Sequence, residues 1–127
     1  MVALFEKLVV LDQEAFSDGH YSVAYHLLAA ALHCAVDDNN LQNLARVSTM
    51  AAEHLVWIDA NAPDYEHSTI SAAARGHGSI YSMLARQAQG KTLILNRKNH
   101  WPVTHVIEEV QNATPEKPDM KNTEVKN

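Results

Sequence analysis

One stretch of the chain dominates any prediction of its fold: Gly19-His20-Tyr21-Ser22-Val23-Ala24-Tyr25-His26-Leu27-Leu28-Ala29-Ala30-Ala31-Leu32. The glycine can end one helix, because it adopts the left-handed conformation without strain. After it, Tyr21, Ala24, Leu28 and Ala31 recur at the spacing of one helix face. The small side chains of Ala24 and Ala31 let a second helix approach closely. The stretch therefore predicts the turn and the second helix of a tightly packed helical hairpin.

The residues before this turn supply the first helix of the hairpin. Apolar side chains at helical spacing predict a helix over residues 2–16, with a stripe formed by Leu4, Leu8, Leu11 and Ala15 and widened by Phe5 and Val9. Ser17-Asp18-Gly19 ends this helix, and the second helix is predicted over residues 21–36.

Nine residues of this hairpin resemble a tetratricopeptide-type helical pair: Leu8, Leu11, Ala15, Gly19, Tyr21, Ala24, Leu28, Ala31 and Leu32. The resemblance covers roughly a quarter of the chain. It departs from the family pattern at Asp12, where the family favours a small residue, and no proline closes the second helix. What the resemblance implies is an all-helical fold that binds proteins in a concave groove.

Two further helices are predicted after the hairpin. Asp37-Asp38-Asn39-Asn40 forms a turn, and Asn39 with Gln42 resembles a capping box for a helix over residues 40–59. That helix is apolar on two faces, which indicates packing on both sides. Pro63 ends it. A fourth helix, capped by Asp64, is predicted over residues 65–89 and ends at Gly90.

The segment Arg75-Gly76-His77-Gly78-Ser79 lies inside the predicted fourth helix. Glycine costs a helix about 1 kcal/mol relative to alanine, so two glycines need an explanation. They can form a smooth surface with neighbouring alanines for close packing. Alternatively, the chain kinks here, Ser79 caps a new helix, and freed backbone amides beside Arg75 bind an anion. We favour close packing.

The chain changes character after Gly90. Residues 92–95 allow either a helix or an extended segment, and Pro102 suits the first turn of a short helix ending at Val110. Residues 112–127 are almost entirely polar, which predicts a flexible tail. We therefore expect one helical domain over residues 1–111. Its fold class is all-α, with two antiparallel helical hairpins (tetratricopeptide-like or a four-helix bundle), a short C-terminal helix and a disordered tail.

Composition limits the function. The net charge of −5 argues against nucleic-acid binding and against attraction to anionic membranes. No apolar run is long enough to cross a membrane, and the N-terminus lacks a signal peptide. The single Cys34 forms no internal disulfide, which fits a cytoplasmic location. No motif indicates a cofactor.

The eight histidines invite a metal hypothesis, but their spacing does not support it. His26 and His33 lie seven residues apart, about 10 Å along a helix, and no recognised metal-binding motif occurs. We interpret both as surface residues and predict no metal site. His54 and His77 fall within apolar stripes, so each needs a hydrogen-bond partner. Tyr25, Tyr81 and Ser48 are candidates for that role.

These observations favour a non-catalytic protein-interaction module, in which an apolar groove receives a peptide or a second copy of the chain as a homodimer. The candidate binding residues are Tyr25, His26, His33, His54, Trp57, Arg75 and His77. The alternative is a small-molecule or metal-binding helical bundle, with enzymatic activity carried by His54, His77 and Arg75. A permanent structural subunit of a larger assembly is a third hypothesis.

Overall fold

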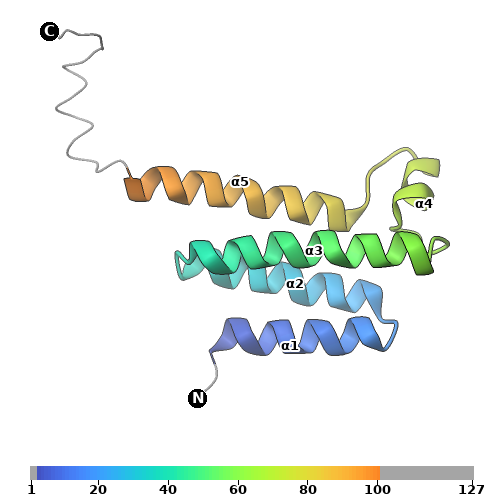
Figure 1. Ribbon diagram of the computed structural model, residues 1–127, viewed down its shortest axis with the longest axis horizontal. Helices are drawn as coiled ribbons and strands as arrows, with labels where there is room; N and C mark the ends of the chain where they lie inside the picture. Colours follow the sequence, from blue (N-terminus) through green and yellow to red (C-terminus); the bar gives the residue numbers. More distant parts are fainter. Residues whose placement is uncertain (1–2, 101–127) are drawn as a thin grey trace, which may run out of the picture. The chain divides into compact units, whose positions relative to one another are not determined.

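A computed structural model describes residues 3–100, and these form helices joined by turns, with no strand among them (Figure 1). The helices are α1 (Leu4–Ser17), α2 (Tyr21–Asp37), α3 (Leu41–Asn61), α4 (Thr69–Ala74) and α5 (Ile80–His100). The all-α prediction is therefore confirmed. No helix within residues 3–100 combines the length and the apolar character that crossing a membrane requires.

The turn between α1 and α2 forms as the glycine predicts. Gly19 has a φ of +84°, a conformation that residues with a side chain rarely adopt. Its amide donates to the Phe16 carbonyl at 3.0 Å, and the His20 amide donates to the Ala15 carbonyl at 2.8 Å. These bonds satisfy carbonyls at the end of α1 and reverse the chain into α2.

The next turn repeats this geometry with an asparagine. Asn39 has a φ of +53°, and the Asn40 amide donates to the Ala35 carbonyl. Asn40, not Asn39, caps α3 and accepts a 2.9 Å bond from the Asn43 amide. The predicted capping box is therefore wrong by one residue, because Asn39 takes the left-handed position that ends α2.

Helix α2 packs its small-residue face into the core. Ala24, Leu28, Ala31 and Leu32 are buried, as the sequence predicts. On α1, Phe5 and Val9 of the predicted stripe are buried together with Asp12, whereas Leu4 and Leu11 of that stripe are exposed. The buried face of α1 is rotated relative to the predicted stripe, because it includes the Asp12 carboxylate, which bonds to His54. Hydrophobic periodicity alone would place an aspartate in solvent.

The predicted fourth helix, residues 65–89, is wrong. A short helix, α4, ends at Ala74, Gly76 follows in a turn with a φ of +85°, and α5 begins after Ser79. The Ser79 hydroxyl accepts a 3.1 Å bond from the Tyr81 amide, so Ser79 caps α5. Of the two interpretations of this segment, the kink is confirmed and the favoured packing surface is wrong, because Gly76 and Gly78 lie exposed in a turn.

Gly90 does not end the last helix, and residues 92–95 continue it. The chain divides into two units, Met1–Leu93 and Ile94–Asn127, and everything that follows concerns the first. The predicted short helix up to Val110, the domain end at residue 111 and the tail over residues 112–127 lie outside the described residues.

Candidate functional site

An open groove runs along α3 where α5 borders it, with a volume of about 660 Å³. Helix α3 supplies most of its walls and α5 contributes one residue. The lining is mostly small or apolar: Ser48, Thr49, Ala52, Glu53, Val56, Trp57, Ala60, Asn61 and Gln89. We call this surface the α3 groove. Glu53 is its only charged residue.

Two large apolar side chains stand at the α3 groove. Val56 is 70% exposed and Trp57 is 44% exposed, although both sit in the middle of a long helix. Two aromatic side chains pack against Trp57. The centroid of its ring lies 5.5 Å from that of Phe16, in an edge-on arrangement, and 5.8 Å from that of Tyr21. An aromatic ring that is packed against its neighbours and still partly exposed is prepared to bury its free surface against another apolar group.

One turn before Trp57, His54 forms a buried hydrogen bond with the Asp12 side chain of α1. The His54 Nε2 donates to the Asp12 Oδ2 at 2.8 Å. The Asp12 side chain is 0% exposed and the His54 side chain is 12% exposed. Phe16 stacks on the imidazole at 3.9 Å, with only 9° between the ring planes. This arrangement joins α1 to α3 through a contact that water hardly reaches.

The Asp12 carboxylate is only half satisfied. Its Oδ1 is buried and has no hydrogen-bond partner among the described residues. An unpaired buried acceptor costs about 1–3 kcal/mol, so this atom lowers the stability that Asp12 contributes. The bond between Asp12 and His54 also fixes how α1 lies against α3. The contact positions Trp57, because Phe16 touches both His54 and Trp57.

Tyr81 of α5 closes the other side of this cluster. Its ring meets His54 edge-on at 5.7 Å, and its hydroxyl donates to the Tyr21 carbonyl at 2.5 Å. Burial raises the pKa of the Tyr81 phenol well above its usual value, and the nearby Asp12 carboxylate raises it further. The phenol therefore remains neutral and serves as a hydrogen-bond donor that fastens α5 to α2.

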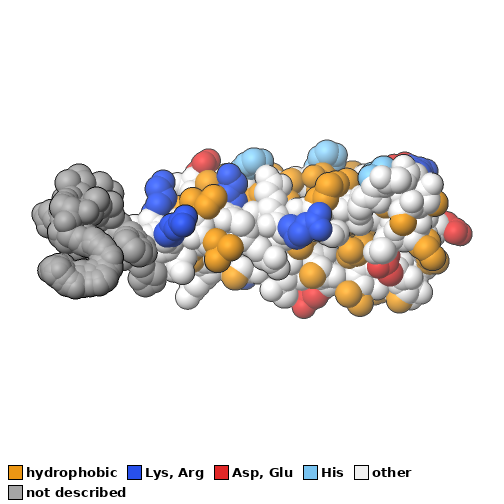
Figure 2. All heavy atoms as spheres, turned by 90° about the horizontal axis from the view of Figure 1, so that it is seen from above, with side chains coloured by type: hydrophobic (Ala, Val, Ile, Leu, Met, Phe, Trp, Pro, Cys, Tyr) orange, Lys and Arg blue, Asp and Glu red, His pale blue; other side chains and the backbone are white. Residues whose placement is uncertain are grey.

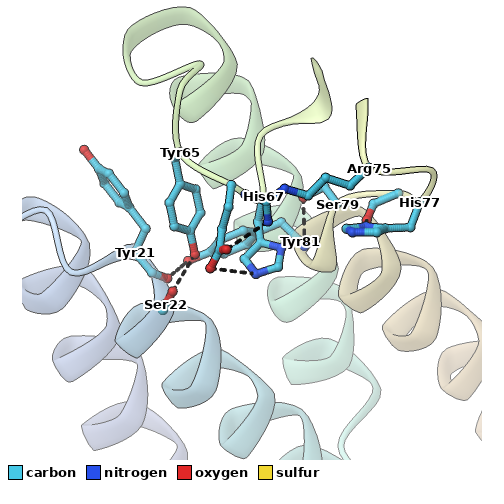
Figure 3. Close-up of polar contacts among 10 residues, drawn as sticks. Tyr21, Ser22, Tyr65, His67, Arg75, His77, Ser79 and Tyr81 are labelled. Carbon is cyan, nitrogen blue, oxygen red and sulfur yellow. Dashed lines mark hydrogen bonds and ion pairs between the residues drawn. The ribbon is translucent and has the colours of Figure 1, made fainter. Parts of the chain in front are cut away.

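The segment between α3 and α5 carries a second polar cluster, drawn in Figure 3. Tyr65 shares a 2.7 Å hydrogen bond with Ser22 of α2. Arg75 donates to Glu66 at 3.0 Å, and this bond lowers the pKa of the Glu66 carboxyl. His77 bonds through its Nδ1 to the carbonyl of the adjacent Gly78. These bonds tie the segment to α2 and to itself.

The structure separates the sequence-predicted binding residues into three places. His54 and Trp57 lie at the α3 groove or directly behind it. Tyr25, His26 and His33 lie on α2 and do not line the groove, although Tyr25 packs edge-on against Tyr81. Arg75 and His77 lie in the turn before α5.

The three residues of the alternative hypothesis do not form one site. Within the described residues, no hydrogen bond, ion pair or ring contact joins His54 to Arg75 or to His77. A search of the same residues finds no group of three or more histidine, cysteine, aspartate or glutamate side chains placed to hold a metal ion. Within residues 3–100, one ring contact joins two histidines, His67 and His77, whose centroids are 6.5 Å apart.

Sequence reasoning missed Asp12 and Val56. Of the three partners suggested for His54, only Tyr81 touches it, and Ser48 instead donates to the Ala85 carbonyl at 3.3 Å. The signal for Asp12 was available: a lone acidic residue interrupts the small residues expected at that position of the hairpin. Nothing in the sequence marks Val56 as exposed, because the exposure of one apolar residue in an apolar helix depends on where the neighbouring helices end.

Comparisons with protein-family models, with curated proteins and with solved structures find no match to this chain.

Proposed function

We propose that the protein is a non-catalytic interaction module that binds an apolar helix or peptide in the α3 groove. The observation that carries this proposal is Trp57, a large aromatic ring that packs against Phe16 and Tyr21, lines the groove and remains 44% exposed. Aromatic residues placed this way dominate the binding energy of many interfaces. The resemblance of the first hairpin to a tetratricopeptide pair supports the same class of function.

The shape of the groove favours a helical ligand. Its floor is formed by small side chains, among them Ser48, Ala52 and Ala60, which let another backbone approach closely. Val56 and Trp57 supply the apolar surface that an amphipathic helix would cover with residues at helical spacing. Glu53, which has no ion-pair partner among the described residues, favours a ligand that carries a lysine or arginine beside its apolar stripe.

A panel of synthetic amphipathic peptides tests this proposal. Each peptide carries leucines at helical spacing and one lysine, and its binding is measured by fluorescence anisotropy. We expect Trp57→Ala to weaken the best peptide by about thirtyfold, the effect of losing an interface hot spot. Val23→Ala is the matched control, because Val23 is an exposed apolar residue on α2 away from the groove.

A second variant guards against misfolding, since Trp57 also touches Phe16 and Tyr21. Val56→Glu changes a residue that lines the groove and is largely exposed, so it places a charge on the binding surface without opening the core. Circular dichroism checks that each variant retains its helices. Peptides that bind the Trp57→Ala and Val56→Glu variants as tightly as the native chain would show that the groove is not the binding site.

A further inference from the structure

The α3 groove is an uncovered surface of α3 beside α5. Helix α3 lies against the hairpin of α1 and α2, with an ion pair to α1 from Arg46 to Glu6 and a hydrogen bond from His54 to Asp12. In Figure 1, α5 follows on the other side of α3, and the groove is lined by α3 and by Gln89 of α5. The described residues supply no helix to cover it.

At the opposite end of the row of helices, α1 exposes an apolar stripe of its own. In Figure 1, α1 and α5 lie on opposite sides of α2 and α3. Helix α1 exposes Leu4, Val10 and Leu11, which are 61%, 50% and 47% exposed, and Leu4 and Leu11, seven residues apart, share one face. Large apolar side chains that repeat along one face of a helix indicate a surface that another helix covers.

The two ends also differ in charge. Over residues 80–93, helix α5 contains Arg86 and Lys91 but no aspartate or glutamate, and Figure 2 shows Lys and Arg side chains beside hydrophobic ones on the face of the molecule that it draws. Every acidic residue of the described chain precedes α5. On α1, Lys7 and Glu14 are exposed and form no ion pair with another described residue. Lys7, between Leu4 and Leu11, therefore complements Glu53 of the groove, and Glu14 complements the cations of α5.

We infer that the α3 groove of one chain receives helix α1 of a second copy, so that chains associate head to tail. This inference rests on the proposed function, because it names the helix that the groove binds. Apolar residues of α1 would cover Val56 and Trp57 of the partner chain, and these complementary charges would favour this orientation over end-to-end pairing of like faces. Such contacts between two different surfaces add one chain after another unless an end is blocked.

Two variants block the two ends separately. Leu11→Glu places a charge on the exposed stripe of α1, and Val56→Glu places one in the groove; glutamate is a good helix former, so neither change should disturb its helix. Val23→Glu, at an exposed valine of α2, is the matched control. Sedimentation velocity of the full chain over a wide concentration range reports the size of the particles.

We expect the native chain and Val23→Glu to form species larger than a monomer as concentration rises, and each blocked variant to stay monomeric. A mixture of the Leu11→Glu and Val56→Glu chains should form a one-to-one dimer, because each retains the surface that the other lacks. Pairing of identical surfaces would not give this result, since the variant that keeps the pairing surface would then dimerise alone.

Other outcomes overturn the inference in distinguishable ways. If the native chain stays monomeric at every concentration but Trp57 still carries peptide binding, the groove functions and its partner is not a second copy. If Leu11→Glu still self-associates while Val56→Glu does not, the groove receives another part of the chain. A monomeric native chain that binds vesicles of anionic phospholipid would show that the basic side of α5 serves a lipid surface instead.

Discussion

Asp12 has a short side chain but a large effect on how α1 packs against α3. It occupies a position where a small side chain would be expected, and it is fully buried against His54. A buried polar pair of this kind is often no more stabilising than two apolar residues of similar volume, whereas breaking one by removing a single partner is strongly destabilising. The pair therefore acts mainly to define how α1 sits on α3.

This interpretation of the bond between Asp12 and His54 predicts an unusual double-mutant result. His54→Leu leaves the Asp12 carboxylate buried without its partner, so we expect a loss of about 3–5 kcal/mol in the free energy of unfolding. Adding Asp12→Leu should recover most of that loss, because both polar groups are then gone. Urea unfolding curves of the two single variants and the double variant measure the effect. A double variant no more stable than His54→Leu would contradict the prediction.

Tyr81 predicts how stability depends on alkaline pH. Its phenol pKa is raised in the folded chain, while in the unfolded chain it ionises near 10. Above about pH 10 the unfolded state therefore binds fewer protons than the folded state, and stability falls as pH rises, by at most about 1.4 kcal/mol per pH unit for this group. Below that pH the contribution is fully present.

Tyr81→Phe tests this dependence. The variant loses the hydrogen bond to the Tyr21 carbonyl, which lowers its stability at neutral pH by about 1 kcal/mol. It should also lose part of the alkaline decline; some remains, because burial raises the pKa of Tyr65 as well. Denaturant unfolding at about pH 9 and pH 11 gives both slopes. Equal slopes in the native chain and the variant would rule out Tyr81 as a source of the decline.

Among the helices and turns, glycine has two opposite roles. Gly19 ends α1 with a φ of +84°, and Gly90 lies within the regular helix α5; a Cβ at either position would meet no atom within 4 Å. Only the backbone conformation therefore distinguishes the two positions, which makes them a matched pair for substitution.

We expect alanine to have opposite effects at these two glycines. Gly19→Ala forces a side chain into the left-handed region and should cost about 1–2 kcal/mol. Gly90→Ala should stabilise the protein by about 1 kcal/mol, because alanine is the better helix former. Thermal unfolding of both variants at a concentration too low for self-association measures the two shifts. Destabilisation by Gly90→Ala would indicate that the helix is not regular there.

At the level of the whole molecule, peptide binding and self-association compete for one surface. If the α3 groove holds α1 of a neighbouring chain, an excess of the best amphipathic peptide should return the native chain to a monomer. Sedimentation velocity with and without peptide checks this. A native chain that keeps its larger size while the peptide occupies the groove would show that the two events use different surfaces.

A structural feature of this protein could be predicted from the sequence when the residues that cause it lie close together in the chain. The hairpin of α1 and α2 was predictable, because Gly19 and the spacing of Ala24, Leu28 and Ala31 act over a few neighbouring residues. The break before α5 was harder to predict. It depends on Gly76 taking a left-handed conformation and on Ser79 capping the next helix, and a longer continuous helix was an equally good match to the apolar spacing.

The amino-acid sequence by itself determined that this chain is helical and where its first hairpin turns, since helix formation and glycine geometry depend on nearby residues. Only the packed structure brought Asp12 against His54, rotated the buried face of α1 and left Trp57 beside an open groove. The physical reason is that these contacts join residues some 40 positions apart in the chain, and their formation depends on how whole helices lie against one another.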